Sequence, residues 1–181
     1  MNPLPSAVFL DRDGTIIKDV KYISRPDQVE LLPGAAEAIG RINARLVPVI
    51  VATNQSGIGR GYFTLADYES VERKVDELLA ERGAHIDATY FCPNKPDDGA
   101  HCRKPDTGMF EQAAADLGID PDKALFVGDR WRDVEPALRF GAHGVLVPAE
   151  RTPPDEIQRA ETDARVADSL ATALDWYLCA N

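Results

Sequence analysis

The chain has 181 residues, the length of one compact domain at the usual size of about 100–200 residues. Hydrophobic residues make up 44% and charged residues 28%, which excludes a wholly disordered or fibrous chain. Acidic residues outnumber basic ones by 30 to 20, for a formal charge of -10. Proteins that bind nucleic acids or anionic membranes typically carry a basic excess, so we expect neither partner.

The cysteine content and the first residues indicate the compartment. Cys92, Cys102 and Cys179 are too few for a disulfide framework, which favours a reducing environment. The N-terminal residues carry no basic leader, and charged residues soon interrupt the first apolar run. We therefore expect neither a signal peptide nor a membrane span, and a cytoplasmic location.

Short apolar runs alternate with amphipathic stretches along the chain. Five runs are predicted to be buried strands, at residues 7–10, 47–53, 88–91, 124–127 and 144–147. The spacing of apolar residues predicts helices at residues 35–46, 64–83 and 107–117, after Asp133, and at residues 169–178. Residues 151–156, with two adjacent prolines, are typical of a surface loop. The alternation predicts an α/β fold: a three-layer, Rossmann-like parallel sheet of about five strands with helices on both faces.

Ligands of such folds bind beyond the carboxyl ends of the strands. The first predicted strand ends in Asp11-Arg12-Asp13-Gly14-Thr15. Residues two apart in an extended segment point the same way, so Asp11 and Asp13 converge on one site. Their mutual repulsion is relieved by a divalent cation. One carboxylate can attack phosphorus while its neighbour transfers protons. The alternative is a simple Asp-Gly turn after a strand.

Three further segments follow predicted strands or precede helices. Residues 53–57 (Thr-Asn-Gln-Ser-Gly) offer a hydroxyl, two amides and backbone N–H groups to phosphate oxygens, or form an ordinary turn. Lys104 can neutralise charge on a transferred phosphoryl group, or lie on the surface as most lysines do. Asp129 and Asp133 extend the acidic cluster, although Asp133 also suits a helix N-cap.

Taken together, these segments resemble a known family. DRDGT at 11–15, TNQSG at 53–57, RKP at 103–105 and GDRWRD at 128–133 are similar to the four motifs of the haloacid dehalogenase-like (HAD-like) hydrolases, and they span most of the chain. The resemblance implies Asp11 as nucleophile, Asp13 as general acid/base, and Thr53 and Lys104 as stabilisers of the phosphoryl group. It also implies Mg²⁺ held by Asp11, the Asp13 backbone carbonyl and Asp129, with Asp133 behind these ligands.

The segments between the motifs are short. They leave no room for a large cap domain, so we expect a single domain over residues 1–181 whose loops set specificity at an open site. Those loops are similar to the branch that contains D-glycero-D-manno-heptose-1,7-bisphosphate 7-phosphatases and histidinol-phosphatase domains. TNQSGIGRG at 53–61 and CRKP at 102–105 carry most of this likeness.

The likeness to this branch implies a substrate and its contacts. The substrate would be a sugar bisphosphate, hydrolysed at its 7-phosphate through an aspartyl-phosphate. The implied sugar-phosphate contacts are Asp19, Val20, Lys21, Tyr22, Asn54, Gln55 and Ser56. Arg103 would bind the distal phosphate with its guanidinium fork, and Arg60 and Arg130 are further candidates for anion contacts.

One loop departs from the pattern of this branch. Relatives hold a structural zinc on a Cys-x-His and a later Cys-x-Cys, whereas here Asn94 and Ala100 replace two of the ligands and His101 is displaced. Cys92 and Cys102 alone do not form a closed four-ligand set, so we expect no bound zinc and two loop thiols.

Other functions remain open at this point. Within the same fold, histidinol phosphate or another small phosphomonoester is the alternative substrate. A receiver-type signalling domain is also an α/β protein phosphorylated on aspartate, but it needs neither Asp13 nor the GDxxxD segment. A phosphate-binding protein with an inactive site is disfavoured because every catalytic position holds a competent residue. Small capless members of the family are often monomers, and we expect one here.

Overall fold

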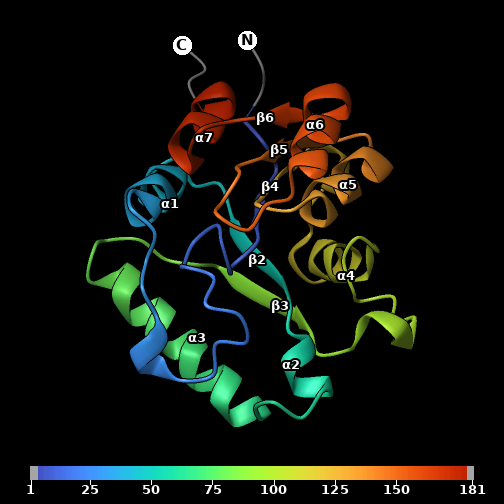
Figure 1. Ribbon diagram of the computed structural model, residues 1–181. Coiled ribbons are helices and arrows are strands. Elements are labelled where there is room, and N and C mark those ends of the chain that lie inside the picture. The colour runs from blue at the N-terminus through green and yellow to red at the C-terminus, as the bar shows by residue number, and fades with distance from the viewer. Residues whose placement is uncertain (1–3, 179–181) are drawn as a thin grey trace.

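The computed structural model describes residues 4–178 and contains a parallel sheet of six strands in the order β3-β2-β1-β4-β5-β6 (Figure 1). The strands are β1 (Val8–Leu10), β2 (Val49–Asn54), β3 (Ala88–Cys92), β4 (Leu125–Gly128), β5 (His143–Leu146) and β6 (Arg165–Val166). The predicted α/β class and the five predicted strands are confirmed. The short sixth strand, which extends the sheet beyond β5, was not predicted.

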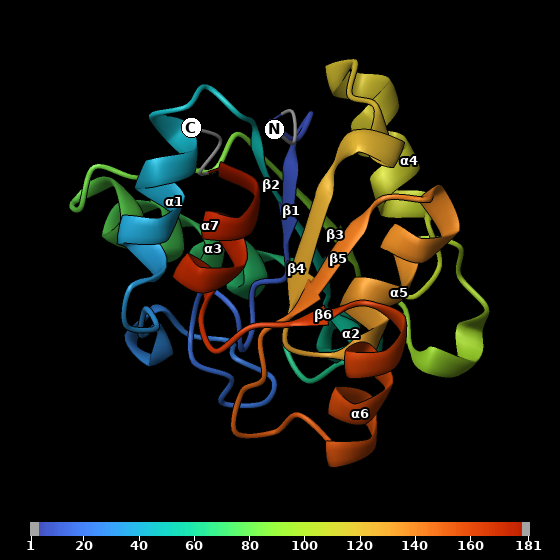
Figure 2. The same cartoon turned by 90° about the horizontal axis from the view of Figure 1, so that it is seen from above.

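Helices cover both faces of this sheet. They are α1 (Ala35–Asn43), α2 (Ser56–Gly59), α3 (Leu65–Ala80), α4 (Gly108–Leu117), α5 (Trp131–Phe140), α6 (Pro154–Asp163) and α7 (Leu170–Leu178). Three short 3-10 turns, at Pro26–Gln28, Pro96–Asp98 and Pro121–Lys123, lie in the connections. Figure 2 shows α1, α3 and α7 on one side of the strands and α4, α5 and α6 on the other, which confirms the three layers.

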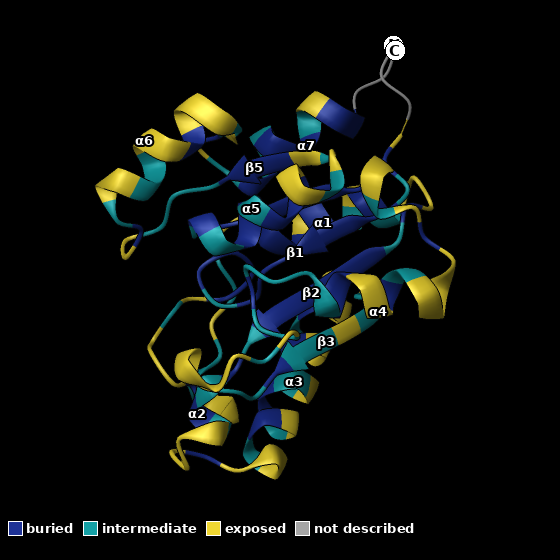
Figure 3. Cartoon of the chain, turned by 90° about the vertical axis from the view of Figure 1, so that its right-hand side faces the viewer, coloured by how far each residue is buried: buried dark blue, intermediate teal, exposed yellow. Residues whose placement is uncertain are grey.

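Alternation along the strands separates the core into two halves. Val8 and Leu10 of β1 pack with the helices α1, α3 and α7, whereas Phe9 faces α4. The Phe9 ring lies 5.1 Å from Phe110 of α4 and 4.9 Å from Phe126 of β4. In Figure 3 the strands β1, β2 and β5 are dark blue and the outer helix faces are yellow. A residue's place along β1 therefore decides which half of the molecule its side chain enters.

Two predicted boundaries were wrong. Residues 151–156 were expected to be a loop, but α6 begins at Pro154, because proline suits the first position of a helix. The helix expected after Asp133 begins at Trp131 instead. Asp133 is thus not the N-cap: it lies in the first turn, where its Oδ2 accepts a hydrogen bond from the backbone N–H of Arg130 at 3.0 Å.

The sheet order places a crevice at the ends of β1 and β4. From β1 the chain runs outward through β2 and β3, then returns to form β4 on the other side of β1. Such a reversal opens a crevice at the carboxyl ends of the two central strands. No large cap is inserted within residues 4–178. In the same part of the chain, no helix has the length and apolar character to cross a membrane.

Candidate active site

A buried lysine lies at the centre of the crevice. Lys104 is 3% exposed, and its Nζ lies 2.7 Å from Asp11 Oδ1 and 2.7 Å from Asp133 Oδ1. The same Nζ donates to the Ala52 carbonyl at 2.5 Å. Asn54 holds the lysine backbone in place, since its side-chain amide exchanges two hydrogen bonds of 3.1 Å with the N–H and carbonyl of Lys104. The alternative of a surface lysine is therefore excluded.

The acids around Lys104 have perturbed pKa values. Burial raises the pKa of Asp11 to about 6, although the positive charge of Lys104 opposes the rise. Burial, together with the charges of Asp11 and Asp133, raises the pKa of Asp129 to about 8. Burial also disfavours the charge on Lys104, but Asp11 and Asp133 raise its pKa above the ordinary value. Three carboxyl groups thus surround one ammonium, with Arg132 as a second positive charge near Asp129, and negative charge remains in excess.

The same acids fit a divalent cation. Asp11, Asp129 and Asp133 each offer a carboxylate oxygen, and these oxygens lie within 4.8 Å of one another. Asp129 Oδ1 is buried and has no hydrogen-bond partner within residues 4–178. The backbone at Gly14 approaches so closely that a Cβ there would lie 2.5 Å from Asp129 Oδ2. Hard oxygen ligands in a site short of positive charge suit Mg²⁺.

Asp13 is held by groups that lie beside the crevice. Its carboxylate accepts hydrogen bonds from Arg12 Nη2 at 3.0 and 3.1 Å and from Gln55 Nε2 at 2.8 Å. Arg12 is fully buried, and its Nη1 donates to Glu72 of α3. Sequence reasoning missed Arg12 and Glu72. The alternation along β1 could have placed Arg12 among the core residues facing α3, where an arginine needs an acidic partner.

Thr53 of β2 and Gln55, which follows the strand, lie beside Asp13. Thr53 is 1% exposed, and its hydroxyl accepts a hydrogen bond of 2.8 Å from Gln55 Nε2, the same amide nitrogen that binds Asp13. A hydroxyl and an amide thus lie beside the carboxylates, at the carboxyl ends of neighbouring strands.

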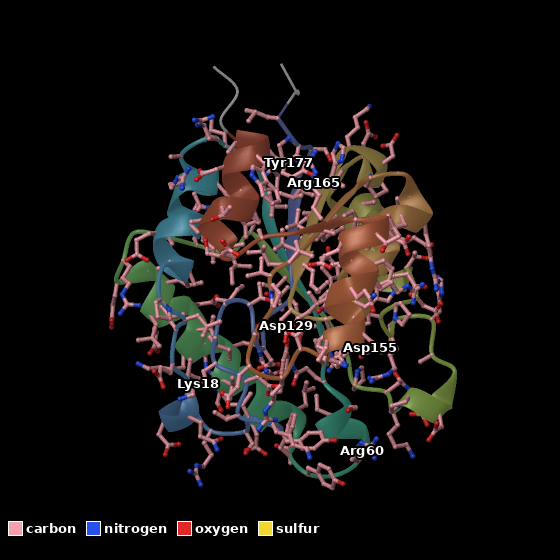
Figure 4. The ribbon with its side chains drawn as sticks, turned by 45° about the horizontal axis from the view of Figure 1, so that its top comes forward. Lys18, Arg60, Asp129, Asp155, Arg165 and Tyr177 are labelled. Carbon is pink, nitrogen blue, oxygen red and sulfur yellow. A yellow bond between two sulfur atoms is a disulfide. The ribbon has the colours of Figure 1, made fainter. Side chains whose placement is uncertain are left out.

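A cavity of about 400 Å³ opens above these groups. Among the predicted substrate contacts, those in its lining are Asp19, Lys21, Tyr22, Asn54, Gln55, Ser56, Arg60, Arg103 and Arg130. Val20 is not in the lining and is 37% exposed. Arg132 and Arg151 also line the cavity, and sequence reasoning missed both. Figure 4 shows Asp129 near the middle of the molecule, with Lys18 and Arg60 on segments below it.

The two cysteines of the atypical loop are joined. Cys92 and Cys102 form a disulfide with Cα atoms 5.4 Å apart, so the expectation of two loop thiols was wrong. Cys92 ends β3 while Cys102 lies two residues before Lys104, and the fold brings these positions together. The third cysteine, Cys179, lies outside the described residues. Disulfide sulfurs are not thiolates, so this state offers no sulfur ligand to zinc.

Comparison with known proteins identifies the family. A family model described as HAD-hydrolase-like matches residues 101–173. The chain is 36% identical, over 184 residues, to the D-glycero-D-manno-heptose-1,7-bisphosphate 7-phosphatase of Thermosynechococcus vestitus, with 94% of each chain covered. The chain belongs to the HAD-like hydrolases.

Further relatives of this HAD-like hydrolase agree. It is 43% identical over 143 residues to the D-glycero-beta-D-manno-heptose-1,7-bisphosphate 7-phosphatase of Pseudomonas aeruginosa, covering 78% of this chain and 80% of the relative. Its fold matches the crystal structure of the D,D-heptose 1,7-bisphosphate phosphatase of B. bronchiseptica complexed with magnesium and phosphate, with a TM-score of 0.87 and 34% identity. That match covers 96% of this chain and 98% of the other.

Proposed function

We propose that this HAD-like hydrolase is a Mg²⁺-dependent phosphatase that removes the 7-phosphate of D-glycero-D-manno-heptose 1,7-bisphosphate. The arrangement of Asp11, Lys104 and Asp129 beneath an arginine-lined cavity carries the proposal. Relatives at 36% and 43% identity that bear this enzyme's name support the choice of substrate. The chemistry of the site supports the roles that we assign to its residues.

The reaction would take place in two steps. A carboxylate oxygen of Asp11 attacks the phosphorus atom, and the bond to the sugar oxygen breaks as Asp13 gives that oxygen a proton. Asp13 then removes a proton from water, which attacks the aspartyl-phosphate and releases inorganic phosphate and free Asp11. Lys104 and the Thr53 hydroxyl stabilise the charge on the phosphoryl oxygens.

A bound Mg²⁺ would neutralise charge between the Asp11 carboxylate and the phosphate dianion. Asp11 and Asp129 are the side chains proposed to hold the ion, with Asp133 beside them, because their oxygens converge and Asp129 Oδ1 has no other partner in the described chain. The ligand role of the Asp13 carbonyl remains a prediction, as does the absence of zinc.

Phosphate release from a substrate panel tests the proposal. The panel holds D-glycero-D-manno-heptose 1,7-bisphosphate, histidinol phosphate, fructose 1,6-bisphosphate and p-nitrophenyl phosphate, each with Mg²⁺ and with EDTA. We expect the heptose bisphosphate to have the highest kcat/KM, and phosphorus NMR to show the 1-phosphate retained. Preference for histidinol phosphate, or full turnover in Asp11→Asn, would contradict the proposal.

A further inference from the structure

Arg130 lines the cavity, and its guanidinium is already bound by an acidic side chain. The guanidinium of Arg130 forms a two-point ion pair with Glu156 of α6: Nε lies 3.0 Å from Oε2, and Nη2 lies 2.6 Å from Oε1. Glu156 also accepts the backbone N–H of Trp131 at 2.6 Å. The fork that would bind a phosphate is therefore engaged by a carboxylate, and that carboxylate is itself fixed to the first turn of α5.

Arg132 lies two residues further on and differs from Arg130. It lines the cavity, yet no hydrogen bond or ion pair joins its side chain to any residue between 4 and 178. Its Nε is buried and lacks a partner. A buried donor of a charged group that stays unpaired is costly, and such a group gains most from an anionic ligand.

Arg132 has charged neighbours of both signs: it interacts electrostatically with the carboxylates of Asp129 and Glu156 and with the guanidinium of Arg103. Arg103 also lines the cavity; its Nη1 donates to the Asn94 carbonyl at 3.1 Å, which fixes the guanidinium at one end. Burial and the nearby charges of Arg132 and Arg60 lower the pKa of Arg103. Three guanidinium groups therefore line one cavity and repel one another, and a dianion bound there would reduce this repulsion.

This positive group is distinct from the place where phosphate is transferred. The transferred phosphoryl group must approach Asp11, beside Lys104. Arg103 instead interacts electrostatically with Tyr22, Arg60 and Arg132 of the cavity lining, whereas Asp11 and Lys104 are not part of that lining. A substrate with two phosphates fills both places at once, whereas a substrate with one phosphate leaves the arginines without an anionic ligand.

We propose that Arg132, together with Arg103, binds the second, non-reacting phosphate of the substrate, and that Arg130 does not. This inference rests on the proposed function and adds the residue that selects bisphosphates over monophosphates. A guanidinium can bind two phosphate oxygens at once, and Arg132 has its fork free. Arg130 would first have to break its two hydrogen bonds to Glu156.

The test compares four variants on two substrates. The variants are Arg132→Met, Arg132→Lys, Arg130→Met and the control Arg139→Met. Arg139 is on the same helix, exposed, and paired with Glu135 and Asp106 outside the cavity. The substrates are the heptose 1,7-bisphosphate and p-nitrophenyl phosphate, which lacks a second phosphate.

A hydrogen-bonded charge is worth enough to change KM for the bisphosphate about 10- to 100-fold. We expect Arg132→Met to cause that rise, with a loss of kcat/KM at least tenfold larger than for p-nitrophenyl phosphate. Arg132→Lys keeps the charge without the fork and should give an intermediate KM. Arg130→Met should raise KM less than Arg132→Met, and Arg139→Met should match the wild type.

Equal losses on both substrates in Arg132→Met, or a larger rise of KM in Arg130→Met, would overturn the inference. The proposed function, by contrast, would be refuted if the wild-type enzyme showed no preference for the bisphosphate over p-nitrophenyl phosphate. If Arg132→Met does not fold, Arg132→Lys and Arg130→Met still decide which arginine binds the phosphate.

Discussion

Replacement of Lys104 by methionine tests the charge balance of the buried site. Methionine keeps nearly the same volume and removes only the ammonium, so packing changes little. Asp11 and Asp133, both almost fully buried, each lose an ion partner at 2.7 Å. Removal of one partner of a buried pair typically costs about 3–5 kcal/mol of unfolding free energy. Turnover should fall about 10²- to 10³-fold or more, because a group that stabilises the phosphoryl oxygens is lost.

The stability loss should depend on pH. The pKa of Asp11 is raised from 3.8 to about 6 in the folded chain even with Lys104 present, and without the lysine it rises further. At pH 5 the carboxyl group of the variant is therefore protonated, and no buried negative charge is left unpaired at Asp11. At pH 8 that carboxyl group carries far more of its charge, so the penalty is larger.

Urea unfolding in EDTA, followed by circular dichroism at pH 5 and pH 8, measures both quantities. We expect the larger loss at pH 8. Lys123→Met is the matched control, because Lys123 is exposed and pairs only with its neighbour Asp120 on the surface. A loss below about 1 kcal/mol at pH 8, or equal losses at the two pH values, would refute the reasoning.

Three further predictions follow from the site. Gly14→Ala should raise the Mg²⁺ concentration for half-maximal turnover about tenfold, because Gly14 has a φ of +92° and a Cβ at this position would displace Asp129. An unchanged Mg²⁺ titration would contradict this prediction. The raised pKa of Asp129 makes the metal-free fold less stable as pH rises from 4 to 8. Mg²⁺ should therefore increase Tm more at pH 8 than at pH 6. Equal increases in Tm at the two pH values would argue against a metal at Asp129. The double variant Cys92→Ser/Cys102→Ser should lose about 2–3 kcal/mol of unfolding free energy under non-reducing conditions. Dithiothreitol should cause a similar loss in the wild type. Elemental analysis of the wild type should find no zinc.

The parts of the site that follow strands could be predicted from the sequence. Asp11, Thr53 and Asp129 lie at the carboxyl ends of apolar runs, and parallel strands bring such positions to one edge of the sheet. Lys104 follows no strand, so only the resemblance of the RKP segment to a family motif indicates its role, and no physical feature of the local sequence shows that it is buried. Its place depends on the paired hydrogen bonds with Asn54, fifty residues away, which no local pattern encodes.

The disulfide was missed for a related reason. Three cysteines indicate a reducing compartment on composition alone, whereas pairing depends on whether two positions meet in space. The end of β3 and the segment before Lys104 meet in the fold, although the two cysteines are 10 residues apart along the chain. The result is a covalent tie across the base of the loop that leads into Arg103, at the place where the sequence pattern of relatives puts a metal.

The assignment of the distal phosphate shows how an error in secondary structure affects a functional inference. From the sequence, Arg103 is expected to bind the distal phosphate and Arg130 is a further candidate for an anion contact, and nothing points to Arg132. What separates them is Glu156, and Glu156 lies in the first turn of α6. The two prolines at 153 and 154 indicated a loop, in which a glutamate would have no fixed position. Proline at the first helical position instead starts a helix that directs Glu156 at the Arg130 fork. On the proposed assignment, a helix start more than twenty residues away thus decides which arginine is free to bind phosphate. Glu156→Gln should release Arg130 to compete with Arg132, so the rise of KM caused by Arg132→Met should be smaller in the Glu156→Gln background.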